Sequence, residues 1–292
     1  MSMDGIILIN KPLHITSYQV IRQLKLILGP HKYGHTGTLD PLASGMLPIC
    51  VNRATKVASL FTQGCKVYTA EMQLGATTHT GDSESALQHI SFVTEEHLGR
   101  LASAMRAFQG VIWQTPPMYS AIKIKGQKLY QLARRNQYVA VPARPIHIYA
   151  LHLLALNRSS YTIRMRIHCS KGTYIRTLVE DIGKFLGCGA YLRSLHRHTV
   201  SNINDAHMIT LAALEQLPPA ERLLHIHPVS AFFTDIPQVF LEEHEAEALL
   251  RGSYLPKDPG LRKYYYQENF LGLLERQQQL ITFKYLCLTR SP

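Results

Sequence analysis

The sequence predicts an α+β fold, and two observations support this class. Segments with strand-like alternation are mixed with scattered helical segments, without the regular β-α-β order that builds a doubly wound parallel sheet. Hydrophobic residues make up 46% of the 292 residues. A chain of this length and composition can bury the core of one large domain, with or without a small additional module.

The first elements surround an unusual polar segment. Residues 5–9 form a short apolar run bounded by Gly and Pro, which predicts a buried strand. Residues 17–28 show helical periodicity, and Ser17 can cap this helix. Residues 34–48 are Gly-rich and too polar for a core element, and Pro41 fixes the chain directly after Asp40. We interpret this segment as a rigid loop that presents one carboxylate, which is typical of a functional site.

The following elements are predicted from periodicity and capping residues. In chain order they are a short helix at 55–61, a strand at 67–74, a helix at 94–108 that opens at a capping residue, strands at 144–155 and 160–169, and a helix at 173–186. In the strand at 160–169 the polar positions Thr162, Arg164, Arg166 and His168 alternate with apolar ones. This pattern predicts one buried and one exposed face.

Residues 116–145 combine basic and aromatic side chains, which suits a surface that follows phosphates and stacks on bases. The residues concerned are Lys123, Lys125, Lys128, Arg134, Arg135 and Arg144, with Tyr119, Tyr130 and Tyr138 between them. A solvated, charged helix and loop is the alternative interpretation.

A domain boundary is expected between residues 225 and 237, where Pro228 and Pro237 flank a short apolar segment. The residues after it contain turns and short strands, such as 270–274 and 280–288. From the residues alone, this part could be any small β subdomain.

The charge of the chain favours an acidic partner. The net charge is +11 and the isoelectric point is about 9.5. Residues 237–292 carry seven Lys and Arg against seven Asp and Glu, so the whole excess lies in the first 236 residues. A polyanion is therefore expected to bind mainly to the large domain.

The patterns of cysteine, histidine and hydropathy further limit the class of protein that the sequence can encode. The five cysteines are scattered without a Cys-x-x-Cys pair, which favours reduced thiols over a disulfide or metal site. His196-Arg197-His198 could bind a metal, but a basic strand that faces RNA is the favoured interpretation. The sequence shows no signal-peptide core and no apolar run of membrane length. We expect a soluble, intracellular protein.

Several motifs in order resemble one family, the tRNA pseudouridine synthases that modify uridine 55 of the T-loop (the TruB family). The resemblance runs from about Gly5 to about Val200. Its motifs are Gly-Ile-Ile-Leu-Ile-Asn-Lys-Pro at 5–12, Gly-His-Thr-Gly-Thr-Leu-Asp-Pro-Leu-Ala-Ser-Gly at 34–45, Lys-Val-Tyr at 66–68, Pro-Pro-Met-Tyr-Ser-Ala-Ile-Lys at 116–123 and Cys-Ser-Lys-Gly-Thr-Tyr-Ile-Arg-Thr-Leu at 169–178.

The resemblance implies a fold and a function. The fold would be a pseudouridine synthase catalytic domain at 1–232, with a mixed, largely antiparallel sheet, flanking helices and an RNA-clamping insertion at 116–145. Residues 233–292 would form a small, PUA-like β-barrel that binds RNA. The implied activity is isomerisation of uridine 55 to pseudouridine by base flipping, with a secondary role in tRNA folding. The partner would be the T-stem-loop of tRNA. We expect a cytoplasmic monomer that needs no cofactor, metal or membrane.

The reaction breaks the N1–C1′ bond of uridine, rotates the base and forms a C5–C1′ bond. It needs a carboxylate beside the ribose and a base that removes the C5 proton. The resemblance assigns Asp40 as nucleophile or base, Arg176 as its cationic partner, and Tyr68 as the residue that stacks on the base and takes the C5 proton. A lone Asp more often caps a turn, and a strand Tyr more often packs in a core.

Other positions match supporting motifs. The resemblance implies that His35 enters the T-loop where the target base has left, and that Tyr174 and Leu195 contact the substrate. Lys11 and Asp82 are interpreted as supporting structure. Three residues depart from the family pattern, namely His79 in place of Asp, Ser85 in place of Gly, and His196 where Arg is common.

Two other classes of protein are alternatives. A non-catalytic RNA-binding protein or tRNA chaperone would not need Asp40, Tyr68 and Arg176, so their presence favours an enzyme. A phosphohydrolase with an Asp nucleophile would need Mg²⁺ and a second acid nearby, and no Asp-x-Asp pair lies close to Asp40.

Overall fold

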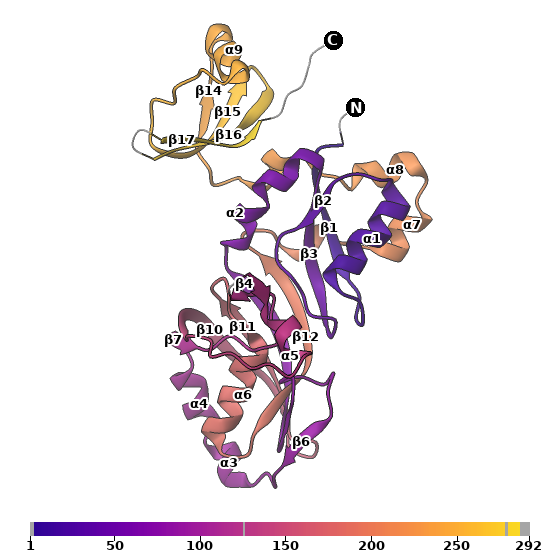
Figure 1. The fold of residues 1–292 in the computed structure, drawn as a ribbon, viewed down its shortest axis with the longest axis vertical. Helices are drawn as coiled ribbons and strands as arrows, with labels where there is room; N and C mark the ends of the chain where they lie inside the picture. The colour runs from indigo at the N-terminus through magenta and orange to yellow at the C-terminus, as the bar shows by residue number, and fades with distance from the viewer. Residues whose placement is uncertain (1–2, 125, 278–279, 287–292) are drawn as a thin grey trace.

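The computed structural model describes residues 3–124, 126–277 and 280–286. Two predicted features lie outside these residues. They are the contribution of Lys125 to the insertion and the end of the last predicted strand, at 287–288. Figure 1 shows an elongated large body, with a smaller C-terminal sheet at the same end of the molecule as the N-terminus.

A mixed, largely antiparallel sheet of nine strands runs through the large body in the described residues, in the order β13-β1-β3-β12-β4-β11-β10-β7, with β2 paired to β3. Only the pairs β1–β13 and β12–β3 are parallel. The strands are β1 (Gly5–Lys11), β2 (Tyr33–His35), β3 (Ala43–Val51), β4 (Lys66–Leu74), β7 (Gly110–Gln114), β10 (Arg144–Asn157), β11 (Thr162–Cys169), β12 (Ala190–Val200) and β13 (Ile209–Thr210). The predicted α+β class and sheet type are confirmed.

Helices lie beside this sheet. They are α1 (Ser17–Leu28), η1 (Asn52–Val57), α2 (Ala58–Thr62), α3 (Glu95–Gly99), α4 (Leu101–Ala107), α6 (Ile175–Leu186), η2 (Asp205–His207), α7 (Leu211–Gln216), α8 (Pro219–Leu224) and η3 (Val229–Phe232). Figure 1 places α3, α4 and α6 at one end of the large body and α1, α7 and α8 at the other.

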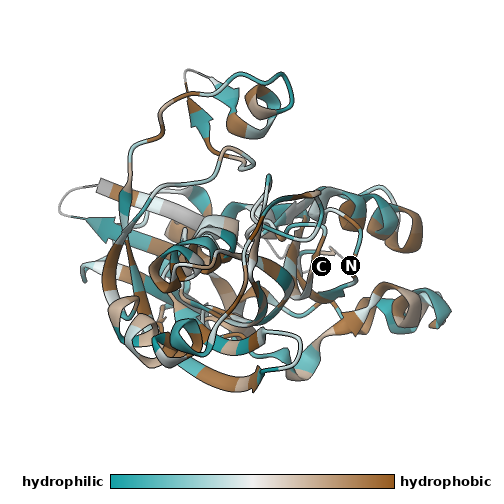
Figure 2. Ribbon diagram, turned by 90° about the horizontal axis from the view of Figure 1, so that it is seen from below, coloured by the Kyte–Doolittle hydropathy of each residue, from teal (hydrophilic) through white to brown (hydrophobic). Residues whose placement is uncertain are grey.

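The strand pattern explains the main core. Burial alternates along β4 and β11, as the sequence predicts, because successive side chains point to opposite faces of the sheet. Hydrophobic and hydrophilic residues alternate along the strands in Figure 2. The inward residues of β11, such as Ile163 and Met165, join one cluster with Leu178 and Ile182 of α6. The core therefore lies between α6 and one face of the sheet.

The start of α1 corrects one detail. The helix spans Ser17–Leu28 as predicted, but its cap is Thr16, which accepts a hydrogen bond from the backbone of Gln19 in a capping box. Ser17 is buried instead, and its hydroxyl bonds the backbone of Leu39. Tertiary packing thus gives Ser17 a partner that its sequence neighbours do not reveal.

The predicted loop at 34–48 is wrong at both ends. Residues 33–35 form β2, and residues 43–51 form β3, a central strand that is almost wholly buried. Gly45 has φ +98°, and a Cβ on it would lie 2.3 Å from the backbone oxygen of Arg197 on β12. The glycine therefore permits close strand pairing, and the rigid loop is restricted to residues 36–42.

The predicted helix at 94–108 is divided into α3 and α4. Thr94 caps α3 as predicted, with His97 completing the capping box. Arg100 separates the two helices. Gly99 at the end of α3 is a poor helix former, which explains the interruption.

The insertion contains β8 (Lys123–Ile124), β9 (Gln127–Lys128) and α5 (Leu129–Ala133). Arg144 and Pro145 at the end of the predicted range already belong to β10, and the predicted limits of the insertion stay a prediction. A further small sheet pairs β5 (Ala76–Thr78) with β6 (Leu87–Ile90).

The C-terminal part is a four-stranded sheet in the order β14-β15-β16-β17, with one helix, α9 (Glu243–Arg251), among the described residues. The strands are β14 (Gln238–Phe240), β15 (Gly260–Tyr266), β16 (Asn269–Gln277) and β17 (Leu280–Leu286). Leu273 and Tyr285 of this sheet share a core cluster with Ile6 and Phe61 of the large body. A closed barrel and a boundary at 232/233 stay predictions.

Among the described residues, no helix is long and apolar enough to cross a membrane.

Candidate functional site

A cavity of about 550 Å³ collects most of the predicted site residues. Its lining includes Asp40, Tyr68, Asp82, Tyr174, Arg176 and Leu195, which come from separate segments of the chain. Tyr119, Tyr130 and Arg134 of the insertion also line it. The insertion therefore forms one wall of the same cavity that holds Asp40.

Buried contacts from two neighbouring segments fix the loop that carries Asp40. The hydroxyl of Ser17 accepts a hydrogen bond from the backbone of Leu39 at 2.9 Å and donates one back to its carbonyl at 3.1 Å. Lys11 is fully buried, and its Nζ donates to the carbonyls of Pro12, Ile15 and Pro41 at 2.8, 2.7 and 3.4 Å. The position of Asp40 thus depends on β1 and α1.

Arg176 connects Asp40 to the rest of the site. It lies at the start of α6, is 4% exposed, and places Nε 3.0 Å from Oδ2 of Asp40. Its Nη1 donates to the carbonyl of Thr80 at 3.0 Å and lies 3.6 Å from Oδ2 of Asp82, while Nη2 donates to the carbonyl of Tyr119 at 2.8 Å. One guanidinium therefore joins the Asp40 loop, the turn that contains Thr80 and Asp82, and the insertion.

Asp82 is 2% exposed and occupies the far side of this network. Its carboxylate accepts hydrogen bonds from the Thr80 hydroxyl and from the backbone of Glu84. Asp82 therefore holds the turn from which Thr80 presents its carbonyl to Arg176, and it also lines the cavity.

Burial raises the pKa of Asp40 above its ordinary value, and the neighbouring Asp82 adds to this shift. The positive charges of Arg176, which forms the ion pair with Asp40, and of Lys11 oppose it. The Asp40 side chain keeps 37% exposure toward the open cavity, so a substrate can reach it. The site holds a carboxylate of increased basicity whose charged form is stabilised by a fixed cation.

Tyr68 lies on β4 directly opposite Arg197 on β12. Burial raises the pKa of the Tyr68 phenol, while the charge and hydrogen bonding of Arg197 oppose the shift. Arg197 is 1% exposed and is held by the carbonyls of Met46 at 2.7 Å and Gly37 at 3.2 Å. Arg197 can therefore stabilise negative charge at the Tyr68 oxygen.

Tyr174 is held at the N-terminus of α6 by its backbone. Its N–H donates to Oε1 of Gln114 at 2.8 Å, and its carbonyl accepts from Nε2 of the same residue at 3.0 Å. The guanidinium of Arg144 lies 5.6 Å from the Tyr174 ring and donates to the carbonyl of Gly172 at 2.9 Å. A fixed backbone thus presents an aromatic ring to the cavity.

The remaining predicted residues lie in different places. Leu195 is 7% exposed on β12 and contributes an apolar wall to the cavity. His35 lies on β2 outside the cavity lining, and its Nδ1 is buried without a hydrogen-bond partner among the described residues. Burial, with the charge of Arg197, lowers the pKa of His35, so the neutral ring is favoured. Lys11 also lies outside the lining and acts through the loop.

All three residues that depart from the family pattern form hydrogen bonds. The ring of His79 shares hydrogen bonds with Gln88 at 3.1 Å and with the hydroxyl of Tyr138 at 3.4 Å, and it meets the Tyr119 ring edge-on at 5.5 Å. Ser85 bonds the hydroxyl of Thr80 at 2.8 Å. The ring of His196 bonds the hydroxyl of Ser44 at 2.9 Å. His79 thus contacts the insertion at two of its tyrosines.

Two residues of the site were missed by sequence reasoning. The sequence places Arg197 only in a basic strand, although the residue is buried and lines the cavity. Gln114, 1% exposed at the end of β7, carried no sequence signal. For Arg197 the signal was present in the alternation of β12, where the apolar Leu195 precedes it by two residues and lines the same cavity.

Comparison with protein families gives two matches that together cover most of the chain. Residues 25–175 match the family model of the TruB family pseudouridylate synthase N-terminal domain. Residues 176–227 match the model of the tRNA pseudouridylate synthase B C-terminal domain. The second match ends within the boundary region expected from the sequence.

Relatives with one shared name match over nearly the whole chain. The chain is 40% identical over 280 residues to tRNA pseudouridine synthase B of Clostridium acetobutylicum, covering 93% of this chain and 95% of that protein. It is 40% identical over 294 residues to the protein of the same name from Azoarcus sp. strain BH72, covering 99% and 96%. The protein of the same name from Burkholderia lata is 43% identical over 254 residues, covering 87% and 78%.

Solved structures share the fold at lower identity. One chain of a Cbf5-Nop10-Gar1 complex superposes with a TM-score of 0.71 at 23% identity, covering 98% of this chain and 84% of that one. A chain from an archaeal box H/ACA sRNP Nop10-Cbf5 complex gives a TM-score of 0.70 at 22% identity, covering 97% and 85%. These likenesses show that nearly the whole chain shares a known fold.

Proposed function

Because this chain belongs to the TruB family of pseudouridylate synthases and isomerises uridine to pseudouridine in tRNA, we propose that its target is uridine 55 in the T-loop. The observation that carries the proposal is the ion pair between Asp40 and Arg176 inside a cavity that Tyr68 also lines. A carboxylate, a fixed cation and an aromatic ring are the groups that this isomerisation requires.

In this proposal Asp40 acts at the ribose of the flipped uridine. It either attacks the sugar carbon or removes a sugar proton, and both routes need its charged form. Arg176 stabilises that form in a site where burial favours the neutral acid. The increased basicity of Asp40 makes it a stronger proton acceptor than an exposed aspartate.

Tyr68 is the group we propose for stacking on the base and taking the C5 proton. A buried phenol rarely gives up its own proton at neutral pH, because burial raises its pKa. The role therefore needs the phenolate, formed before the C5 proton moves onto its oxygen, and the buried guanidinium of Arg197 on the opposing strand is the group that stabilises this anion.

The substrate RNA would be held by groups around the cavity mouth. Tyr174 and Leu195 contact the extruded base, and the insertion supplies Tyr130 and Arg134 from the opposite wall. His35, outside the lining but favoured as a neutral ring, would occupy the space that the base leaves in the T-loop.

The same proposal includes the wider organisation of the protein. Lys11 and Asp82 position the loop and Arg176. The chain is divided at 232/233, and residues 233–292 act as a PUA-like module that binds RNA. A monomeric state, a cytoplasmic location and a secondary role in tRNA folding belong to this proposal as well.

The test is a tritium-release assay with the purified chain and a T-arm hairpin that carries 5-tritiated uridine. Release is expected when uridine stands at the target position and not when cytidine replaces it there, with tritiated uridine retained elsewhere. Release from the cytidine hairpin at the same rate would contradict the positional assignment. Binding of the hairpin without any release would favour a non-catalytic RNA-binding protein.

A further inference from the structure

One face of the sheet, on the side away from α6, carries exposed aromatic and basic side chains where β7, β10 and β11 meet. The inward residues of these strands, such as Ile146 and Ile167, are buried in the core with α6. Six of the outward residues, which we call the outer platform, are Trp113 of β7, His147 and Tyr149 of β10, and Arg164, Arg166 and His168 of β11.

The Tyr149 ring contacts two other rings of the outer platform. The Tyr149 ring is 4.3 Å from the His147 ring and 4.8 Å from the His168 ring, with interplanar angles of 34° and 46°. A bulge at Tyr149, between Ile148 and Ala150, places the tyrosine on the same side as the two histidines. Tyr149 is 45% exposed, so part of this ring cluster remains open to a ligand.

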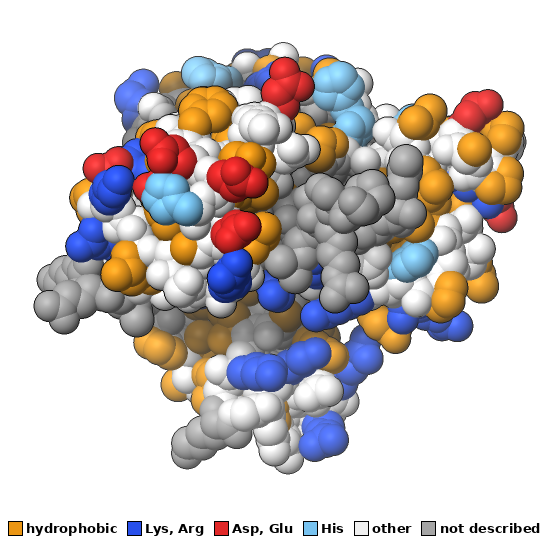
Figure 3. All heavy atoms as spheres, turned by 90° about the horizontal axis from the view of Figure 1, so that it is seen from above, with side chains coloured by type: hydrophobic (Ala, Val, Ile, Leu, Met, Phe, Trp, Pro, Cys, Tyr) orange, Lys and Arg blue, Asp and Glu red, His pale blue; other side chains and the backbone are white. Residues whose placement is uncertain are grey.

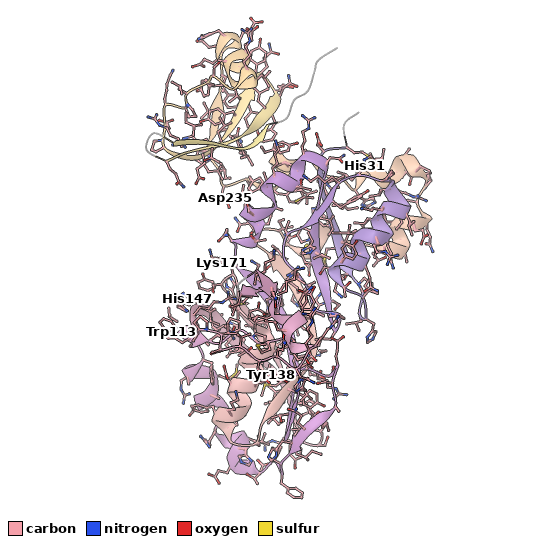
Figure 4. All side chains as sticks on the ribbon, viewed as in Figure 1. His31, Trp113, Tyr138, His147, Lys171 and Asp235 are labelled. Atoms are coloured by element: carbon pink, nitrogen blue, oxygen red, sulfur yellow. The ribbon has the colours of Figure 1, made fainter. Side chains whose placement is uncertain are left out.

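Trp113 extends the aromatic surface to the sheet edge. It is 70% exposed on β7 and stands opposite Pro145 of β10, two residues from His147. Figure 4 shows Lys171, His147 and Trp113 in succession along one side of the large body. Burying a ring of this size against a base would remove much apolar surface from water.

Arg164 and Arg166 add positive charge to the outer platform. Both are exposed, and neither forms a salt bridge with any residue that the structure describes. The acidic residue opposite Arg164 is Glu71 of β4, which pairs with Arg193 on its other side at 3.5 Å. The outer platform therefore keeps a net positive charge. Figure 3 shows a further group of Lys and Arg low in the view without acidic side chains among them, whereas acidic and basic side chains are mixed at the upper left.

The outer platform is continuous with the rim of the catalytic cavity. Ser170 lines the cavity, and its N–H donates to the carbonyl of His147 at 2.8 Å. The backbone N–H of His147 donates in return to the Ser170 hydroxyl at 2.9 Å. Lys171 is exposed and follows Ser170 in the chain. His147, and through it Tyr149, therefore lies next to the Ser170–Lys171 rim of the cavity.

We propose that the outer platform binds unpaired nucleotides of the substrate RNA outside the catalytic cavity. Exposed rings on a sheet, flanked by arginines, suit bases that stack and phosphates that lie alongside them. Charge complementarity favours RNA over an apolar protein surface. This inference rests on the proposed function, because it takes the RNA in the cavity and the RNA on the platform to be one molecule.

Trp113 is the only tryptophan of the chain, so intrinsic fluorescence reports on the outer platform directly. The probes are a blunt T-arm hairpin and the same hairpin with about eight unpaired uridines on either end, a length within the span of typical single-strand sites. The tailed hairpin is expected to quench Trp113 more strongly than the blunt one. Equal quenching by both hairpins would overturn the proposal.

A charge-reversed variant provides the second test. Arg164→Glu with Arg166→Glu should weaken binding of the tailed hairpin about tenfold and lower its log–log salt slope by about 1.5, as expected for two lost phosphate contacts. The matched control is Arg106→Glu with Lys184→Glu, which changes the net charge equally on α4 and α6. The control should leave the preference for the tailed hairpin unchanged.

The outcomes separate this proposal from the proposed function. Tritium release from the blunt hairpin tests the cavity alone and should be nearly unchanged in the platform variant. Equal losses for tailed and blunt hairpins would mean that the two arginines act only through overall charge, which overturns the platform. Absence of isomerisation in the unmodified chain would overturn the proposed function instead. A platform that binds a protein would give no difference between the two hairpins.

Discussion

Arg176 Nε lies 3.0 Å from Oδ2 of Asp40, in a cavity where burial alone would favour the neutral acid. Nη1 and Nη2 of the same guanidinium donate to the carbonyls of Thr80 and Tyr119. The residue whose charge opposes the rise in the pKa of Asp40 is therefore also the one that ties the insertion to the Asp40 loop. We expect any movement of the insertion on RNA binding to affect the protonation of Asp40 through this side chain.

Asp40→Asn should abolish isomerisation and leave tRNA binding within a few-fold of the unmodified chain. The amide keeps the shape of the side chain but can act neither as a nucleophile nor as a base. Tritium release measures the first effect and filter binding the second. Activity close to that of the unmodified chain would remove Asp40 from the mechanism.

Arg176→Gln should shift the acidic limb of the pH–rate profile to higher pH, besides slowing the reaction. The charge of Arg176 opposes the rise in the pKa of Asp40 that burial causes, so its removal lets that pKa rise further. Arg176→Lys keeps the charge and should move the limb less. Single-turnover rates measured across pH test this prediction. Identical midpoints of the acidic limb in both variants would contradict the electrostatic role of Arg176.

Tyr68→Phe should still bind RNA but stall before the product forms. Phenylalanine keeps the ring that stacks on the base and lacks the oxygen that would take the C5 proton. Rates with unmodified RNA are compared over long times, and complexes with 5-fluorouridine RNA show whether the glycosidic bond is cleaved. Pseudouridine formation at a nearly normal rate would leave Tyr68 as a stacking platform only.

Lys11→Met should destabilise the chain near neutral pH and loosen the Asp40 loop, because three carbonyls lose their donor. Unsatisfied buried groups cost about 1–3 kcal/mol each in mutational series, which sets the scale of the loss. Burial lowers the pKa of Lys11 from 10.5 to about 8. The unfolded chain therefore binds more protons than the folded chain between these values, and the free energy of unfolding gains a contribution that rises with pH there.

The methionine variant should lack that rise, so the difference in unfolding free energy between the two chains should grow from pH 8 toward pH 10.5. Urea unfolding across this range measures it. A constant difference would mean that Lys11 is not the titrating group.

Binding should be strongly dependent on salt, and removal of the C-terminal sheet should weaken it only modestly. The net charge of +11 lies in the first 236 residues, and each phosphate contact contributes about −0.7 to −0.9 to the log–log salt slope. A chain that ends at Ile236 keeps Phe233, whose ring lies 5.0 Å from Phe61. Because the truncation removes Leu273 and Tyr285 from the shared core, circular dichroism must first show that the shortened chain is folded. A folded chain without affinity for tRNA would contradict the charge argument.

The sequence predicted the ranges of β1, β4, β10 and β11, and alternation along β4 and β11 is a local property that burial on one face requires. It predicted α1 and α6 from helical periodicity for the same reason. It did not predict β2, β7 or β13 as strands. It did not predict β3 beyond the Asp40 loop, since glycine, serine and proline within residues 43–51 resemble loop residues. Only the close approach of β12 to Gly45 explains why that composition is needed in a central strand.

For the site, the residue types expected to carry the chemistry can be recognised from the sequence alone, because Asp40, Tyr68 and Arg176 lie in sequence motifs. Their electrostatic environment depends on the folded arrangement. Lys11 supports the loop from β1, and Arg197 meets Tyr68 across two strands more than a hundred residues apart. Burial and charge act through space, so the basicity of Asp40 and the environment of Tyr68 follow from packing between segments that are distant in the sequence.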